Sequence, residues 1–153
     1  MTFFNGYDGL LCDLDGVVYA GNQPIDQAIS TLNALIGQGV PVAFVTNNAS
    51  KAATEVADHL IELGVATNAE HVMTSAQAVV DILTVKYHRD AGPVLVTGSP
   101  QLSQQIRAAG FETTQLAADK PQVVVQGFNP KLGWNDLAQA SFAIQQGAGW
   151  LAT

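Results

Sequence analysis

Short apolar segments alternate with longer amphipathic stretches along this chain, and no other feature of the sequence constrains the fold as strongly. The predicted strands are residues 9–14, 40–45, 94–96, 123–125 and a last one around Trp150. Between the first two, apolar side chains recur every three or four residues, as they do on one face of a helix. Strands separated by helices are typical of parallel βαβ units. The sequence therefore predicts an α/β fold.

Capping residues indicate where helices begin. Ser50, Thr74 and Ser99 carry hydroxyl groups that can accept a hydrogen bond from the backbone of a helix N-terminus. We therefore expect helices to begin at these three residues. Two further helices are expected between the first two strands and from about residue 135 to residue 146.

Composition excludes several classes of protein. The 153 residues are 48% hydrophobic and 12% charged, a balance typical of packed globular proteins. The net charge is −7 and the six basic residues are scattered, so we expect no nucleic-acid partner. A single cysteine, Cys12, excludes an intrachain disulfide and suits a reducing compartment. Neither a secretion signal nor a run long enough to span a bilayer is present, so we expect a cytoplasmic protein without a membrane partner.

Two aspartates, Asp13 and Asp15, end the first predicted strand. Their i, i+2 spacing directs both side chains to one face of the strand, while Cys12 and Leu14 point into the core. Like charges about 4 Å apart repel by roughly 4 kcal/mol at an effective dielectric constant near 20, so the pair needs a cation or a shared proton. Mg²⁺ is the natural cation for such ligands, and Gly16 allows the backbone to turn close to a ligand. The alternative is that both acids are ordinary turn residues.

A hydroxyl and two amides end the second predicted strand, at Thr46, Asn47 and Asn48. Such residues are also common in plain turns. If the first two strands are parallel, Asp13 and Thr46 lie at the same carboxyl edge of the sheet, where open α/β sheets bind ligands. Hydroxyl, amide and backbone N–H groups are what a tetrahedral oxyanion needs.

The two segments together resemble motifs of the haloacid dehalogenase superfamily of phosphotransferases. The motifs here are Asp13-Leu14-Asp15-Gly16-Val17-Val18-Tyr19 and Phe44-Val45-Thr46-Asn47-Asn48. They are most similar to the NagD-like branch, which contains sugar-phosphate, nucleotide and para-nitrophenyl phosphatases. Later segments at 96–98, 123–128 and 147–153 are also similar to this branch, so the resemblance spans the whole chain.

The resemblance implies a Rossmann-like parallel-sheet core with an inserted α/β cap. The core would cover residues 1–75 and the cap residues 76–153. Family members carry a lysine motif and an acidic motif after the cap, and this chain has neither. We therefore expect an N-terminal fragment in which the C-terminal core elements are missing.

The activity implied by the resemblance is Mg²⁺-dependent hydrolysis of small phosphate monoesters, such as sugar or nucleotide phosphates, through a phospho-aspartate. Asp13 would be the nucleophile and Asp15 the general acid and base. Both residues would hold Mg²⁺. The substrate phosphate would bind at Thr46, Asn47, Asn48 and Gly16.

Two alternatives stay open at this point. The chain is a non-catalytic fragment that binds phosphate or metal and needs the C-terminal half for activity, or it is a phosphomutase or phosphotransferase of the same superfamily. In each case the expected partner is a small phosphorylated metabolite. An incomplete parallel sheet exposes apolar edges, so we also expect that the chain either self-associates into a homo-oligomer or is less stable than the full-length enzyme.

Other candidate residues carry less weight. Cys12 has no basic neighbour in the sequence, so we interpret it as a core residue. His59 and the other two histidines lack the spacing of metal ligands. Lys120 leads directly into a predicted strand, which favours a turn role over a catalytic one. For Asn129 and Trp134 we favour packing and capping over contact with a substrate.

Overall fold

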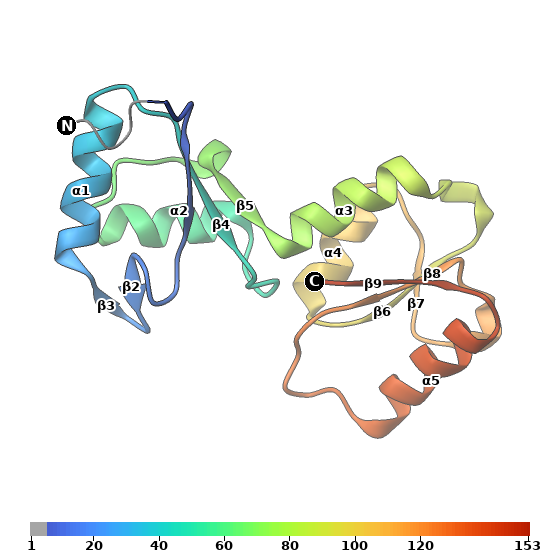
Figure 1. Ribbon diagram of the computed structural model, residues 1–153. Coiled ribbons are helices and arrows are strands. Elements are labelled where there is room, and N and C mark those ends of the chain that lie inside the picture. Colours follow the sequence, from blue (N-terminus) through green and yellow to red (C-terminus); the bar gives the residue numbers. More distant parts are fainter. Residues whose placement is uncertain (1–5) are drawn as a thin grey trace. The chain divides into compact units, whose positions relative to one another are not determined.

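The computed structural model describes residues 6–153, and Met1–Asn5, on which the expectation of no secretion signal partly rests, lie outside the described residues. The described chain forms two compact units (Figure 1). The first unit contains the residues up to Thr46 together with Ala52–Met73, and the second contains Asn47–Lys51 and Thr74–Thr153. No helix in residues 6–153 is long and apolar enough to cross a membrane.

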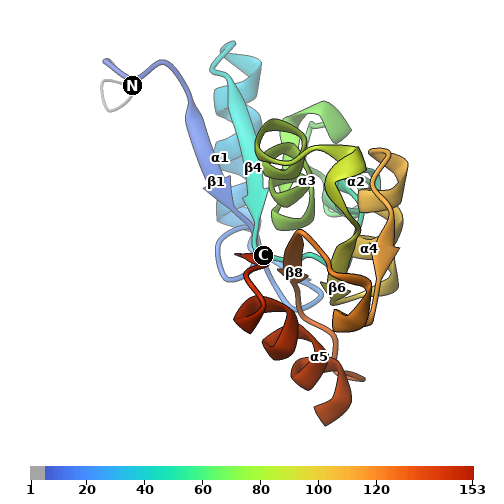
Figure 2. The same cartoon turned by 90° about the vertical axis from the view of Figure 1, so that its right-hand side faces the viewer.

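The first unit is built on a three-stranded sheet with two helices. The strand order is β1 (Leu10–Asp13), β4 (Val42–Thr46) and β5 (Val72–Thr74). The helices are α1 (Asp26–Gly37) and α2 (Ala53–Glu62), and a small antiparallel hairpin is formed by β2 (Tyr19–Ala20) and β3 (Gln23–Pro24). Strands β1 and β4 run parallel with Asp13 opposite Val45, and they lie side by side in Figure 2.

One face of the first sheet carries the hydrophobic core. Buried side chains from β1, β4 and β5 pack there against buried side chains of both helices; they include Cys12, Phe44, Val72, Leu32 and Leu60. The opposite face is open in this unit, because Leu11 of β1 is 75% exposed. Alternation along β1 therefore separates a core-facing side from a solvent-facing side.

The second unit is built on a four-stranded sheet. The strand order is β7 (Thr113–Thr114), β6 (Val94–Thr97), β8 (Val123–Gln126) and β9 (Gly149–Ala152), and all neighbouring pairs are parallel. The helices of this unit are α3 (Ser75–Lys86), α4 (Pro100–Ala108) and α5 (Trp134–Gln145). Single turns of 3₁₀ helix at Ala69–His71, Arg89–Ala91 and Ala117–Asp119 complete the two units.

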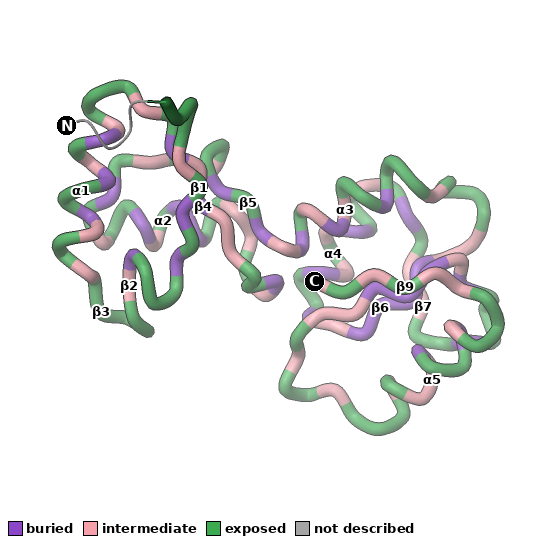
Figure 3. Tube along the Cα trace, viewed as in Figure 1, coloured by how far each residue is buried: buried purple, intermediate pink, exposed green. Residues whose placement is uncertain are grey.

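All four residues of β6 and the first three of β8 are buried, and buried residues are purple in Figure 3. Val94, Val96 and Val125 pack with buried side chains of α3 and α4 on one face. Leu95 and Val124 pack with Ala140 and Ala143 of α5 and with Ala117 on the other face. The near-continuous apolar composition of the two strands follows from this double burial.

The α/β fold class with parallel sheets is confirmed, and so are two predicted helix caps. The Thr74 hydroxyl accepts a hydrogen bond from the Gln77 amide at 3.2 Å, and the Ser99 hydroxyl accepts one from the Leu102 amide at 3.2 Å. The prediction for Ser50 is wrong, because α2 begins three residues later. The Ser50 hydroxyl and amide instead donate to the Asn48 side-chain oxygen at 2.5 and 2.8 Å.

Candidate active site

Two aspartates are exposed where strand β1 ends: Asp13 is its last residue and Asp15 follows two positions later. Cys12 is 6% exposed and Leu14 is fully buried, whereas Asp13 and Asp15 are exposed. The side chains of Cys12 and Leu14 pack in the core, and alternation leaves the two acids on the opposite side of the chain. The alternation predicted from the sequence is therefore present at the end of β1.

The segment after β1 is a tight turn that brings the chain back beside Asp15. Gly16 has a φ of +82°, a backbone conformation that favours glycine. Its amide donates to the Tyr19 carbonyl at 2.7 Å, and the amides of Val17 and Val18 both donate to the Leu14 carbonyl. Gly16 thus shapes the turn, while its own N–H group is already used.

The two carboxylates are held differently. Asp13 Oδ1 accepts a hydrogen bond from the Leu14 amide at 2.8 Å, and among residues 6–153 no group donates to the other oxygen, Oδ2. From the same residues, Asp15 Oδ1 accepts only a long hydrogen bond, 3.5 Å, from the amide of Gly21 in the β2–β3 hairpin. Asp13 is therefore oriented with one oxygen available, whereas Asp15 is loosely held.

Tyr19 lies close enough to both acids for their charges to affect its pKa. Burial, then the charge of Asp15 and then that of Asp13 raise the pKa of the Tyr19 phenol. Its ring makes an edge contact with the ring of His59 in α2, at 5.2 Å between centroids and 71° between planes. Tyr19 is thus placed as a neighbour of the two carboxylates, a position that the sequence analysis did not foresee.

Thr46 lies at the same edge of the sheet as Asp13. Because β1 and β4 are parallel and Asp13 pairs with Val45, Thr46 is one residue beyond that pair. Asp13 and Thr46 therefore lie at the same carboxyl edge of the sheet, as the sequence predicts.

Asn47 and Asn48 follow Thr46 and belong to the second unit. The Asn47 carbonyl accepts a hydrogen bond from the Ser75 hydroxyl at 2.9 Å, and Asn48 fixes Ser50 as described above. Asp13, Asp15 and Thr46 all belong to the first unit. A role for Asn47 and Asn48 beside them stays a prediction.

The donor set at this edge fits a hard divalent cation in part. In the described part of the chain, no Lys or Arg side chain lies within 4 Å of either acid, so the two negative charges are uncompensated by ion pairs. No cluster of three or more His, Cys, Asp or Glu residues is found among the described residues either. Two carboxylates and main-chain carbonyls are oxygen ligands of the kind that Mg²⁺ accepts, together with water and substrate oxygens.

The structure also shows the surroundings of Cys12, His59 and Lys120, to which the sequence analysis gave less weight. Burial and the charge of Asp13 raise the pKa of the Cys12 thiol, which keeps it protonated and inert in the core. His59 packs on Tyr19 and lies 3.9 Å from Glu62. Lys120 ends a 3₁₀ turn with a φ of +53°, in agreement with a turn role.

A comparison with known protein families identifies the family of this chain. The family described as haloacid dehalogenase-like hydrolase matches residues 10–112, which is about two thirds of the chain. The chain belongs to this family. The matched region contains both motifs that carried the resemblance, and similar solved structures include NagD from Escherichia coli K-12, so the predicted branch is confirmed.

Individual relatives cover almost all of this chain. The D-glycerol 3-phosphate phosphatase of Mycobacterium tuberculosis is 42% identical over 146 residues, which are 95% of this chain and 40% of that protein. A 5′-nucleotidase of Bacillus subtilis is 31% identical, over 96% of this chain and 56% of its own length. The chain therefore spans about half the length of the curated relatives it matches.

Solved structures give the same result for the fold. The glycerol phosphate phosphatase of M. tuberculosis, crystallised in complex with magnesium, has a TM-score of 0.82 at 41% identity; 95% of this chain matches 43% of that one. NagD from E. coli has a TM-score of 0.80 at 27% identity and is covered to 55%. The likeness extends over both units, with 95% of the chain covered in each case.

Proposed function

We propose that this chain carries the nucleophile and the acid of a Mg²⁺-dependent phosphatase that hydrolyses small phosphate monoesters, such as sugar or nucleotide phosphates, through a phospho-aspartate. The observation that carries the proposal is the pair of exposed, uncompensated carboxylates at the end of β1, beside Thr46. Family membership and the phosphatases among the relatives support it.

Asp13 is the nucleophile in this proposal. The Leu14 amide holds Oδ1, so Oδ2 is the oxygen that attacks phosphorus and forms the aspartyl phosphate. Such a covalent intermediate splits one difficult displacement into two easier ones. In the second step, water attacks the phosphorus and the Asp13 carboxylate leaves.

Asp15 is the general acid and base. It protonates the leaving alkoxide in the first step and removes a proton from water in the second. The long hydrogen bond to Gly21 leaves this side chain free to reorient between the two roles. A correctly placed acid or base contributes a factor of about 10² to 10⁴ to the rate.

The Asp13 carboxylate and the Asp15 main-chain carbonyl are the groups that would hold Mg²⁺. When bound, the cation supplies charge neutralisation between an anionic nucleophile and an anionic phosphate. Within residues 6–153, no Lys or Arg forms an ion pair with these acids, so their negative charges are available to a cation.

The Thr46 hydroxyl is proposed to hold a phosphoryl oxygen. The proposal extends to Asn47 and Asn48 because they follow Thr46 directly in the chain. Gly16 contributes through the turn that it permits, since its amide is already bonded to Tyr19. In family terms, we assign residues 1–75 to the first part of the core and 76–153 to the cap.

The test is phosphate release by the 153-residue chain from a panel of phosphate monoesters, with and without Mg²⁺. Asp13→Asn is the test variant, and Asp58→Asn is the matched control because Asp58 is an exposed aspartate on α2. We expect Mg²⁺-dependent release that Asp13→Asn reduces to background and Asp58→Asn leaves unchanged. Release by Asp13→Asn at the unsubstituted rate would contradict the proposal.

The second candidate is a phosphate- or metal-binding chain that needs further residues for turnover. It is favoured by the lack of a third acidic ligand among the described residues and by the coverage of about half of the relatives' length. Calorimetric titration with Mg²⁺ distinguishes the two: binding that Asp13→Asn removes, without any phosphate release, supports this second candidate.

A further inference from the structure

The chain changes unit directly after β4. Thr46 is the last residue of β4 and belongs to the first unit, whereas the segment Asn47–Lys51 belongs to the second unit. At Ala52, the residue before α2, the chain returns to the first unit. The segment forms neither a helix nor a strand, so its shape depends on its contacts with the rest of the second unit.

One side chain of this segment is part of the hydrophobic core of the second unit. Ala49 is 4% exposed and belongs to the same buried cluster as Val79 of α3 and Leu102 of α4. Asn47 and Asn48, the two residues before it, are exposed. Burial of apolar surface is non-directional, so it holds Ala49 in place without setting the orientation of the peptide groups before it.

Two serine hydroxyl groups hold those peptide groups. The Ser75 hydroxyl donates to the Asn47 carbonyl at 2.9 Å, and the Ser99 hydroxyl donates to the Ala49 carbonyl at 3.4 Å. Ser75 is the first residue of α3, and Ser99 directly precedes α4. The carbonyl groups before and after Asn48 are therefore bound to the starts of two helices of the second unit.

The two serines differ in what else their hydroxyl groups do. The Ser99 hydroxyl also accepts a hydrogen bond from the Leu102 amide and so caps α4, and its bond to the segment is long. Helix α3 is capped by Thr74 and not by Ser75. In the described part of the chain, the bond to Asn47 is the only hydrogen bond of the Ser75 side chain. The Ser75 hydroxyl therefore serves the segment alone.

The bond from Ser75 restricts more than one carbonyl group. A peptide unit is planar, so the Cα atoms of Asn47 and Asn48 lie in one plane with the Asn47 carbonyl. These two Cα atoms carry the amide side chains that follow Thr46. A hydrogen bond to the carbonyl consequently restricts the position from which each of the two side chains starts.

We propose that Ser75 is a positioning residue for phosphate binding, because its hydroxyl holds this peptide unit in the orientation that presents both amides to a phosphoryl group. The inference rests on the proposed function, in which Asn47 and Asn48 bind the substrate phosphate. Ser75 acts through the backbone and does not contact the substrate. A segment that is ordered in advance loses less conformational freedom when a ligand binds, and this increases affinity.

The test is a titration of the 153-residue chain with inorganic phosphate in the presence of Mg²⁺, followed by the amide NMR signals of residues 47–49. Ser75→Ala removes the hydroxyl, and Ser75→Thr keeps one. We expect Ser75→Ala to weaken phosphate binding about two- to tenfold, the net effect of one neutral hydrogen bond. Ser75→Thr should restore the affinity of the unsubstituted chain, which loss of a merely structural side chain would not explain.

A second measurement follows the order of the segment without any ligand. NMR order parameters of the Asn47 and Asn48 amides report motion on the picosecond to nanosecond timescale. We expect lower order parameters at these two amides in Ser75→Ala and unchanged ones in Ser75→Thr. Circular dichroism checks that Ser75→Ala keeps its helices. Neither this measurement nor the titration depends on turnover.

Ser30→Ala is the matched control. The Ser30 hydroxyl also donates to a main-chain carbonyl, that of Gln27 at 3.1 Å, but it lies on α1 in the first unit. We expect Ser30→Ala to leave phosphate binding and the order of the segment unchanged. An equal loss of phosphate affinity in Ser30→Ala and Ser75→Ala would contradict a specific role for Ser75.

The possible failures of the two proposals are distinguishable. Phosphate binding that is equal in Ser75→Ala and the unsubstituted chain, unchanged order parameters, or a loss that Ser75→Thr does not restore would each overturn the role of Ser75 and leave the proposed function standing. If the unsubstituted chain bound no phosphate, the assignment of Asn47 and Asn48 as phosphate ligands would fail, and the role of Ser75 would fail with it.

Discussion

The position of the two aspartates depends on which residues of β1 face the core, and a pair of leucine substitutions tests this directly. Leu14 is fully buried, whereas Leu11 is 75% exposed. The two leucines flank Asp13 and belong to opposite sides of the chain. Leu14→Ala and Leu11→Ala remove the same atoms from these two environments.

The burial of each side chain sets the expected magnitude. A Leu→Ala change in a core costs about 2 to 5 kcal/mol, because it combines lost burial with a cavity. Full burial of a leucine is worth about 1.5 to 3 kcal/mol, so removing the quarter of Leu11 that is buried costs about 0.5 kcal/mol. Leu14→Ala should therefore be several times more destabilising than Leu11→Ala.

Native-state amide hydrogen exchange of β1 and β4 measures this difference, because both tryptophans lie in the second unit and do not report on the first. Each 1.4 kcal/mol corresponds to a tenfold change in the opening equilibrium. Leu14→Ala should therefore increase the rate of amide exchange through opening of the structure by at least about 25-fold, and Leu11→Ala should increase it by about twofold. Equal acceleration by the two variants would refute the reasoning, because it would mean that Leu11 is as buried as Leu14. Asp13 lies on the same side of the strand as Leu11, so it would then also be covered.

Three further predictions concern single groups. Thr97→Val should raise the free energy of unfolding by about 1 kcal/mol in urea denaturation, because the Thr97 hydroxyl is buried without a hydrogen-bond partner in residues 6–153 and valine has the same shape; a loss of stability would contradict this. Ser99→Ala should lower the free energy of unfolding by about 1 kcal/mol, because α4 loses its cap at Leu102; an unchanged thermal melt would count against it. Burial and the charges of Asp15 and Asp13 raise the pKa of the Tyr19 phenol in the folded chain. The contribution of the protonated phenol to the free energy of unfolding is therefore fully present below the ordinary pKa of 10.0, and it is lost as the pH rises through the raised pKa. Asp15→Asn should lower the Tyr19 pKa in a spectroscopic titration of tyrosinate, and an unchanged pKa would show that the carboxylate is distant.

Local signals made much of the fold predictable. Strands β1, β6 and β8 are short apolar segments bounded by polar residues, and Thr74 and Ser99 cap helices through bonds to residues only three positions away. Strand β7 has two residues and β5 has three, too few for a period to be visible. Neither strand was expected, because each is defined by its neighbours in the sheet.

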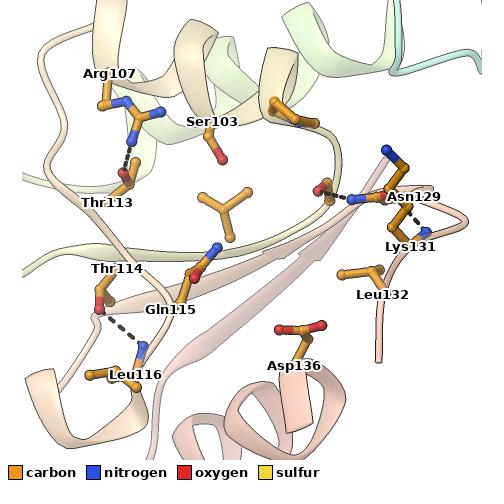
Figure 4. A pocket seen from close by; sticks show the side chains of 13 residues that line it. Ser103, Arg107, Thr113, Thr114, Gln115, Leu116, Asn129, Lys131, Leu132 and Asp136 are labelled. Carbon is orange, nitrogen blue, oxygen red and sulfur yellow. Dashed lines mark hydrogen bonds between the residues drawn. The ribbon is translucent and has the colours of Figure 1, made fainter. Parts of the chain in front are cut away.

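The same distinction explains what could be predicted about the site. Alternation in β1 and a parallel β1–β4 pair were enough to place Asp13, Asp15 and Thr46 on one edge. The approach of Tyr19 depends on the turn at Gly16 and was not visible in the spacing. A cavity in the second unit (Figure 4) is lined by residues up to 40 positions apart in the sequence, from Val96 to Asp136, so no local motif indicated it.

The central claim is that Asp13 attacks phosphorus, and trapping the covalent intermediate tests it most directly. The chain is mixed with a phosphate monoester and Mg²⁺, quenched in acid within the first turnover, and analysed by peptide mass spectrometry. The account predicts a phosphoryl group on Asp13, which is absent without Mg²⁺ and absent in Asp13→Asn. A phosphoryl group on any other residue, or turnover by Asp13→Asn, would contradict it.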